Sequence, residues 1–182
     1  ERIAFLKQFR RQLVATGAVQ PSSRFLARAM VAPLRQARHR APGQQLSIVE
    51  MGPGTGAVTA AIAEAMGAQD TLDCYEINRE FADYLRQRLD SDPIFATSRD
   101  RITVHCAPAQ EAAPATPADF VICSVPLNNL PSGVVRSIFE RGFELLPPGG
   151  TFTFFEYPVL PRLKRLLSSA AERARIDAVS AV

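Results

Sequence analysis

The sequence predicts an α/β domain built on a doubly wound, mostly parallel sheet. Five short runs of apolar or β-branched residues alternate with segments of helical periodicity, and a glycine-rich turn follows the first run. Strands that alternate with helices favour parallel pairing through helical crossovers. The predicted strands cover residues 46–49, 71–76, 102–106, 119–123 and 151–157.

Amphipathic segments lie before, between and after these strands. We expect helices over residues 1–15, 21–40, 57–66, 79–89, 132–146 and from 161 to 167, with a serine of the pair Ser22 and Ser23 capping the second of them. The side chains expected to face the core are Phe25, Leu26, Ala29, Met30 and Leu34, then Phe81, Tyr84, Leu85 and Leu89, then Val135, Ile138, Phe139 and Phe143.

The charge is distributed unevenly along the 182 residues, although the net charge is only +3. Residues 1–40 carry nine Lys and Arg and one acid, residues 41–157 carry seven and fifteen, and residues 158–182 carry five and two. Basic ends of this kind favour a polyanionic partner, either nucleic acid or an anionic membrane. Phe5, Leu6, Phe9 and Leu13 would form the apolar side of a first helix whose other side is basic.

The cysteines and histidines bear on location and metal binding. Cys74, Cys106 and Cys123 each fall in a predicted strand, and such unpaired cysteines favour a reducing cytosol. The sequence contains no run of 18 apolar residues and no visible signal peptide. His39 and His105 are too few and too scattered for a metal site, so no metal is expected.

The glycine-rich turn is the candidate ligand-binding loop. It contains Gly52, Pro53, Gly54, Thr55 and Gly56, and it joins a strand to an alanine-rich helix. Glycines permit a sharp turn and a close approach of a ligand to the backbone. The first N–H groups of the helix then offer a positive dipole end to a carboxylate or a phosphate.

Two classes of cofactor use such a loop: dinucleotides, which carry a pyrophosphate, and cofactors that carry an amino acid. The stretch fits the dinucleotide fingerprint G-x-G-x-x-A formally. Against that interpretation, Glu50 would point a carboxylate at the ligand, which repels a pyrophosphate and holds an ammonium, and Pro53 lacks an N–H. Glu76 ends the next strand 24 positions after Gly52, where an acid binds ribose hydroxyls.

The order Glu50-x-Gly52-x-Gly54-x-Gly56 resembles the first motif of class I S-adenosylmethionine (SAM) methyltransferases, and Glu76-Ile77-Asn78 resembles their second. The resemblance implies a Rossmann-like sheet of seven strands, of which this chain would lack the last two. It also implies SAM as the cofactor, with Glu76 on both ribose hydroxyls and Ala109 and Gln110 beside the adenine.

Four stretches resemble the bacterial phospholipid N-methyltransferases, which act on phosphatidylethanolamine or ornithine lipids. They are residues 16–24, 50–56, 124–131 and 155–157. The related ribosomal RNA adenine dimethyltransferases have Asn-x-Pro and an aromatic at the fourth strand. Ser124 and Leu127 stand at those positions here, so a stacking platform for a base is lost.

The resemblance implies transfer of a methyl group to a lipid amine that has first lost its proton. Glu156 and Tyr157 are the candidates to accept that proton or orient the headgroup, while Ser124, Pro126, Ser22 and Ser23 are expected near the cofactor. Alternatives are an RNA adenine methyltransferase, another small-molecule methyltransferase, and a non-enzymatic membrane-binding protein of the same fold.

The expected organisation has two parts. Residues 1–40 would form basic amphipathic helices that contact the membrane or cover the cofactor, and residues 41–182 the SAM-binding domain, incomplete at its C-terminus. The expected partners are an anionic membrane surface and a lipid amine, with nucleic acid a weaker candidate. The expected location is cytoplasmic, peripheral on the inner face of the cytoplasmic membrane.

Overall fold

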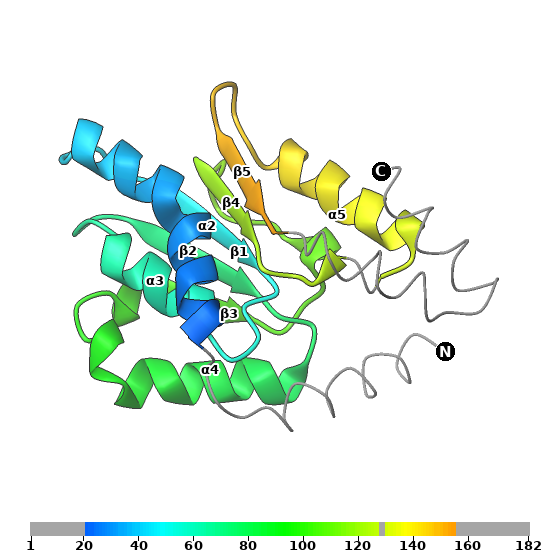
Figure 1. Ribbon diagram of the computed structural model, residues 1–182, viewed down its shortest axis with the longest axis horizontal. Helices are drawn as coiled ribbons and strands as arrows, with labels where there is room; N and C mark the ends of the chain where they lie inside the picture. Colours follow the sequence, from blue (N-terminus) through cyan, green and yellow to red (C-terminus); the bar gives the residue numbers. More distant parts are fainter. Residues whose placement is uncertain (1–20, 128–129, 156–182) are drawn as a thin grey trace.

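A computed structural model describes residues 21–127 and 130–155 of the chain, without the side chains of residues 21–23 (Figure 1). The helices expected at 1–15 and 161–167, and the candidate residues Glu156 and Tyr157, lie outside this range. In chain order the helices and strands are α2 (Pro21–Arg40), β1 (Ser47–Met51), α3 (Ala57–Ala65), β2 (Thr71–Tyr75), α4 (Arg79–Ser91), β3 (Ile102–His105), β4 (Phe120–Cys123), α5 (Ser132–Glu144) and β5 (Thr151–Phe154). Short 3₁₀ turns lie at η1 (Pro93–Phe95), η2 (Arg99–Arg101) and η3 (Ala109–Glu111).

The described strands form one sheet in the order β3-β2-β1-β4-β5, and each neighbouring pair is parallel. The predicted doubly wound sheet is therefore confirmed. The chain runs outward from β1 to β3 and then crosses to β4 on the other side of β1. This reversal places a topological switch point between the carboxyl ends of β1 and β4, where open α/β sheets bind their ligands.

The two faces of the sheet carry different layers. Side chains alternate between faces along a strand, so Ile48 packs with α2, α3 and α4 on one face, and Val49 packs with α5 and η3 on the other. The β-branched and aliphatic strand residues are almost fully buried on both sides, as parallel sheets require. The connection from β3 to β4 contains only η3, so α5 is the long helix on its face among the described elements (Figure 1).

Helix α2 buries a different stripe from the predicted one. It begins at Pro21, so the serines that follow lie in its first turn and not at the predicted cap position. Its most buried side chains are Ala27, Met30, Val31 and Leu34. Phe25 is 72% exposed, because it lies about 160° around the helix from Ala27. The predicted inward position of Phe25 is wrong, and that of Ala29, which is exposed, is wrong too.

The faces predicted for α4 and α5 were too wide. Leu85 and Leu89 are buried as expected, but Tyr84 is 48% exposed. On α5 the predicted pair Val135 and Ile138 is buried, whereas Phe143 is 60% exposed and stacks on Phe139. A helix on a sheet buries a narrow stripe, and large residues at its margin stay partly exposed. All three thiols are free; Cys106 lies beyond the end of β3 and is exposed, which corrects its predicted place in a strand.

The amino end of the sheet is held by an ion pair between α2 and the start of β2. The Arg38 guanidinium donates to both oxygens of Asp70, whose side chain is fully buried. Asp70 also accepts from the backbone N–H of Leu46 at 2.9 Å and of Gly67 at 2.6 Å. One carboxylate therefore joins a helix, the entrance to β1 and the turn before β2.

We expect Asp70→Ala to lower the free energy of unfolding by about 3–5 kcal/mol, because it leaves the Arg38 charge and two backbone N–H groups without their partner. Urea denaturation measures this change. Asp83→Ala is the matched control, since Asp83 is 58% exposed and its ion pair with Arg86 is a surface pair; its effect should stay below about 1 kcal/mol. Equal losses for the two variants would contradict the role given to Asp70.

Candidate cofactor-binding and active site

The glycine-rich loop leaves β1 at the switch point and turns into α3. Gly52, Gly54 and Gly56 have φ angles of 72°, 57° and 83°. Side chains other than glycine rarely adopt these angles. Gly149 is the one other described residue with a positive φ, so left-handed backbone is concentrated in this loop. The three glycines therefore stand at the positions of this loop where the backbone needs a positive φ angle.

The absence of a Cβ has different consequences at the three glycine positions. A Cβ on Gly52 would lie 2.6 Å from Val125 Cγ2, and one on Gly56 would lie 2.6 Å from Leu85 Cδ1. Those two glycines allow the glycine-rich loop to pack against α4 and against the loop that follows β4 (residues 124–127). A Cβ on Gly54 would meet no atom of the described residues within 4 Å. The central glycine therefore faces open space, where the backbone remains accessible to a ligand.

The start of α3 is free of side-chain capping. Gly56 occupies the N-cap position and makes no side-chain cap hydrogen bond, and no side-chain oxygen of the described residues accepts from the first turn. Within the loop, the Gly52 N–H donates to the Tyr75 carbonyl and the Gly56 N–H to the Pro53 carbonyl, both at 2.9 Å. The remaining N–H groups of the helix end suit a carboxylate ligand.

Glu76, directly after β2, links its own strand end to the loop. Its Oε2 accepts from Gly54 N–H at 3.0 Å and its Oε1 from Asn78 N–H at 2.8 Å. Burial raises the pKa of Glu76, and these two hydrogen bonds oppose the rise. Each carboxylate oxygen has a further lone pair, so the group retains acceptors for a pair of vicinal hydroxyls.

The neighbours of Glu76 line the same end of the sheet. Ile77 is 51% exposed, which leaves an apolar side chain next to the carboxylate. Ala109 is buried within η3, and the Gln110 Nε2 donates to Ser137 Oγ on α5 at 3.3 Å. The contacts expected between Ala109 or Gln110 and an adenine remain predictions.

The sequence interpretation directs the Glu50 carboxylate toward a ligand, and in the structure this carboxylate is fully buried. It lies two residues after Ile48 and on the same face, beneath α3, with no exposed surface. Its Oε2 accepts from Thr59 Oγ at 2.6 Å and from Cys74 Sγ at 3.7 Å, and its Oε1 accepts from Ser124 Oγ at 3.1 Å. The carboxylate thus joins β1, α3, β2 and the end of β4.

Burial raises the pKa of Glu50 to about 7 from its ordinary value of 4.5. Hydrogen bonds from Thr59, Ser124 and Cys74 limit the rise, and the nearby Glu76 charge adds to it. Near neutral pH the group is therefore divided between its ionised and protonated forms.

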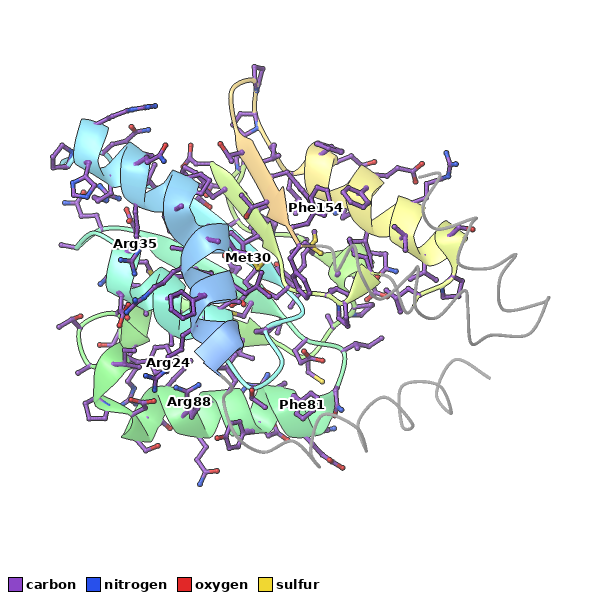
Figure 2. The ribbon with its side chains drawn as sticks, viewed as in Figure 1. Arg24, Met30, Arg35, Phe81, Arg88 and Phe154 are labelled. Carbon is purple, nitrogen blue, oxygen red and sulfur yellow. The ribbon has the colours of Figure 1, made fainter. Side chains whose placement is uncertain are left out.

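Arg88 on α4 is a contact that the sequence interpretation missed (Figure 2). Its Nη1 donates to the carbonyls of Thr55 at 2.8 Å and Gly56 at 3.2 Å. Its other nitrogens bind Asp92, and its guanidinium lies 5.4 Å from the Phe95 ring centre. Arg88 fixes the outer side of the loop across 32 residues of sequence, and no local motif signals such a contact.

The loop after β4, residues 124–127, lies on the other side of the switch point from the glycine-rich loop. Ser124 and Pro126 are half-buried, and Leu127 is 4% exposed in the cluster with Val135 and Ile138. The Ser124 N–H donates to the Met51 carbonyl at 2.8 Å. The loop therefore begins in register with the end of β1.

A protein-family model described as a methyltransferase domain matches residues 48–150, more than half of the chain. The chain belongs to the SAM-dependent methyltransferase family. The ornithine lipid N-methyltransferase of Singulisphaera acidiphila is 28% identical to this methyltransferase over 152 residues, which cover 81% of this chain and 73% of the relative.

Solved structures agree with the fold. An O-methyltransferase from Bacillus cereus, crystallised with SAH, superposes with a TM-score of 0.61 at 18% identity, covering 97% of this chain and 76% of that one. The glycopeptide N-methyltransferase MtfA, complexed with SAM, gives 0.53 at 23% identity, covering 66% and 51%. This methyltransferase thus spans about half the length of the MtfA chain.

The described residues fit SAM, the cofactor of the family. The open side of Gly54 admits a ligand that a Cβ would obstruct, and Glu76 presents free lone pairs for ribose hydroxyls. The uncapped N-terminus of α3 suits the carboxylate of an amino acid. The remaining predicted contacts, from Pro53, Thr55, Ile77, Ser124 and Pro126, stay predictions, and the side chains of Ser22 and Ser23 lie outside the described residues.

We expect Gly54→Ala to abolish measurable SAM binding by calorimetry while destabilising the methyltransferase by only about 1–2 kcal/mol, the strain of a positive φ. Gly52→Ala should lower stability further, because its Cβ meets Val125. Gly133→Ala, on α5 with open space around it, is the control and should keep both stability and affinity. Unchanged SAM affinity in Gly54→Ala would contradict the ligand-facing role of this glycine.

A second prediction concerns the buried Glu50 carboxylate. Because its folded-state pKa is raised, the folded protein binds a proton more tightly than the unfolded chain. Its contribution to stability is therefore complete below pH 4.5 and is lost as the pH rises to about 7, by on the order of 3 kcal/mol.

Glu50→Gln should remove this contribution. Urea denaturation from pH 5 to 8 is expected to give a steeper fall in unfolding free energy for the natural protein than for the variant. Glu64→Gln, at an exposed position of α3, is the matched control and should keep the natural slope. If the unfolding free energies of the natural protein and Glu50→Gln changed in parallel with pH, the ionisation of Glu50 would cost the folded protein no stability.

Proposed function

We propose that this methyltransferase transfers methyl groups to the amine of a membrane lipid headgroup, either phosphatidylethanolamine or an ornithine lipid. The observation that carries the proposal is the 28% identity to an ornithine lipid N-methyltransferase across 81% of the chain. The stretch from Ser124 to Leu127 supports it, since it departs from the pattern of base-modifying relatives.

The packing of Leu127 supports an acceptor other than a nucleobase. The side chain is 4% exposed and packs with α5. It therefore leaves no flat surface on which a flipped-out base would stack. An aliphatic amine needs a narrow site beside the methyl group and no such platform.

The surface of α2 supports an encounter with an anionic membrane. Arg24 and Arg28 are exposed, and Phe25 between them is 72% exposed (Figure 2 labels Arg24). Basic side chains attract anionic lipids, and an exposed aromatic ring inserts at the headgroup level. In the described part of the chain, no helix is long and apolar enough to cross a bilayer. From the basic and aromatic side chains of α2 we propose a peripheral location on the inner face of the cytoplasmic membrane.

Catalysis would rest mainly on positioning and on exclusion of water. Bound SAM supplies an electrophilic methyl group. The half-buried wall from Ser124 to Pro126 would orient the incoming amine, which must reach the site as the free base because an ammonium has no lone pair. Glu156 and Tyr157 remain our proposed proton acceptor and headgroup contact, and both lie outside the described residues.

Incubation with methyl-labelled SAM tests the acceptor. The assay uses vesicles of phosphatidylglycerol mixed with either phosphatidylethanolamine or ornithine lipid, and ribosomal RNA in a parallel reaction. We expect label in one lipid fraction after extraction and chromatography. Glu76→Ala is the control without cofactor binding and should give no label. Label in RNA, or SAM binding without label in either lipid, would refute the lipid proposal.

A further inference from the structure

Arg88 of α4 binds the last two peptide units of the glycine-rich loop before α3 begins. One of its nitrogens, Nη1, donates to the Thr55 carbonyl at 2.8 Å and to the Gly56 carbonyl at 3.2 Å. The Gly56 carbonyl also accepts from the Ala60 N–H at 3.1 Å. In the described part of the chain, Arg88 is the only donor to the Thr55 carbonyl. The orientation of this peptide unit therefore depends on a residue of another helix.

The glycine at position 56 makes this contact possible and also makes it necessary. A Cβ on Gly56 would lie 3.2 Å from Arg88 Nη1, so the missing side chain leaves room for the guanidinium. Glycine also has access to more backbone conformations than any other residue. The peptide units on either side of Gly56 could therefore adopt several orientations, and a contact that fixes their carbonyls selects one of them.

The direction of each carbonyl determines the direction of the N–H in the same peptide unit, because the unit is planar and trans. The Gly56 carbonyl points to Arg88, so the Ala57 N–H at the start of α3 points away from α4. The Thr55 carbonyl also points to Arg88, and the Gly56 N–H of that unit donates to the Pro53 carbonyl at 2.9 Å. Arg88 thus favours the loop conformation in which the N-terminus of α3 is open to a ligand.

Asp92, the residue that caps the C-terminus of α4, orients the guanidinium. Its Oδ2 accepts from Arg88 Nη2 at 2.7 Å and from Nε at 3.2 Å, while its Oδ1 accepts from the Ile94 N–H at 3.1 Å. The hydrogen bond from Arg88, and then that from Ile94, lowers the pKa of Asp92, so the carboxylate is ionised at neutral pH. The buried Phe95 ring, 5.4 Å from the guanidinium, supports it further. The charge of Arg88 is therefore balanced locally, and the loop receives directed hydrogen bonds.

We propose that Arg88 is a positioning residue for SAM, which holds the glycine-rich loop in its binding conformation through the Thr55 and Gly56 carbonyls, and that Asp92 holds Arg88 in turn. Neither side chain needs to touch the cofactor. Without Arg88 the loop would sample other peptide orientations, and the apparent affinity would fall with the fraction of molecules in the binding conformation. The proposal concerns the cofactor of the family and is independent of which acceptor is methylated.

Arg88→Met and Arg86→Met form a matched pair for calorimetry with S-adenosylhomocysteine. Arg86 lies on the same helix and also binds a carboxylate and a carbonyl, those of Asp83 and Val104, each at 2.7 Å, but at the β3 edge of the sheet. We expect Arg88→Met to lose affinity by about tenfold or more. Arg86→Met should stay within about twofold of the natural protein. Equal losses in the two variants would refute a specific role for Arg88.

Amide hydrogen exchange measured by NMR reports the loop conformation directly. In the protein without ligand, the Gly56 N–H should exchange about tenfold faster in Arg88→Met than in the natural protein. The Ile62 N–H, inside α3, should be unchanged, which separates loop opening from a general loss of stability. Arg86→Met should leave both amides unchanged. Saturating S-adenosylhomocysteine should slow the Gly56 N–H again in Arg88→Met.

Two further substitutions test the order of action from Asp92 through Arg88 to the loop. Arg88→Lys keeps a cationic donor on the same side chain and should regain most of the affinity that Arg88→Met loses. Asp92→Asn keeps an acceptor for the Ile94 N–H but removes the charge that orients Arg88, and its loss of affinity should be smaller than that of Arg88→Met. The double variant of Arg88→Met and Asp92→Asn should bind like Arg88→Met alone, because the two residues act in series.

Three more results would overturn the proposal. They are unchanged affinity in Arg88→Met although Gly56 exchanges faster, no recovery in Arg88→Lys, and additive losses in the double variant. The first would mean that loop orientation does not limit cofactor binding, and the third that Asp92 acts independently of Arg88. If Arg88→Met does not fold, Asp92→Asn decides, and unchanged affinity together with unchanged Gly56 exchange would then count against the proposal.

Discussion

A carboxylate with no exposed surface occupies the centre of the sheet, and the geometry of the site depends on it. Glu50 stands where strand alternation calls for an apolar side chain, between Ile48 on its own strand and α3 above. Burial of an ionised group is unfavourable unless hydrogen bonds compensate. Those bonds come from Thr59, Cys74 and Ser124, so one requirement ties α3, β2 and the β4 loop to the end of β1.

The loop above Glu50 is shaped by packing on two sides and openness in the middle. Gly52 and Gly56 let the backbone approach Val125 and Leu85, and Arg88 binds the loop carbonyls from outside. Gly54 alone of the three faces open space. A loop supported in this way holds its backbone, and the first N–H groups of α3 that follow it, in a fixed arrangement before the ligand arrives, which reduces the entropy lost on binding.

Sequence reasoning was most successful where the signal is local. The alternation of strands and helices predicted the parallel sheet, and the three glycines predicted the turn whose φ angles are positive. It failed where the position of a side chain depends on contacts with residues far away in the sequence. The loop carbonyls that Arg88 binds are 32 and 33 residues away, and the exposure of Phe25 depends on which side of α2 meets α3.

The position of Glu50 could have been inferred from strand periodicity. Ile48 and Glu50 are two residues apart, so they share a face, and a buried Ile48 implies a Glu50 beneath the same helix. The motif analogy predicted instead that Glu50 points toward the ligand. It considered the residue type but not the face of the sheet on which every second side chain of the strand lies. The lone polar Thr59 in an otherwise apolar stretch of α3 was a further signal that a buried polar partner exists.

Burial of this charge also has a functional consequence. In the absence of a cation, the raised pKa of Glu50 records an unfavourable environment for its ionised form. A bound ammonium would relieve it, so part of the free energy stored in the folded apoprotein would be recovered as affinity. A residue that lowers the stability of the protein without its ligand would then strengthen the binding of a cationic ligand.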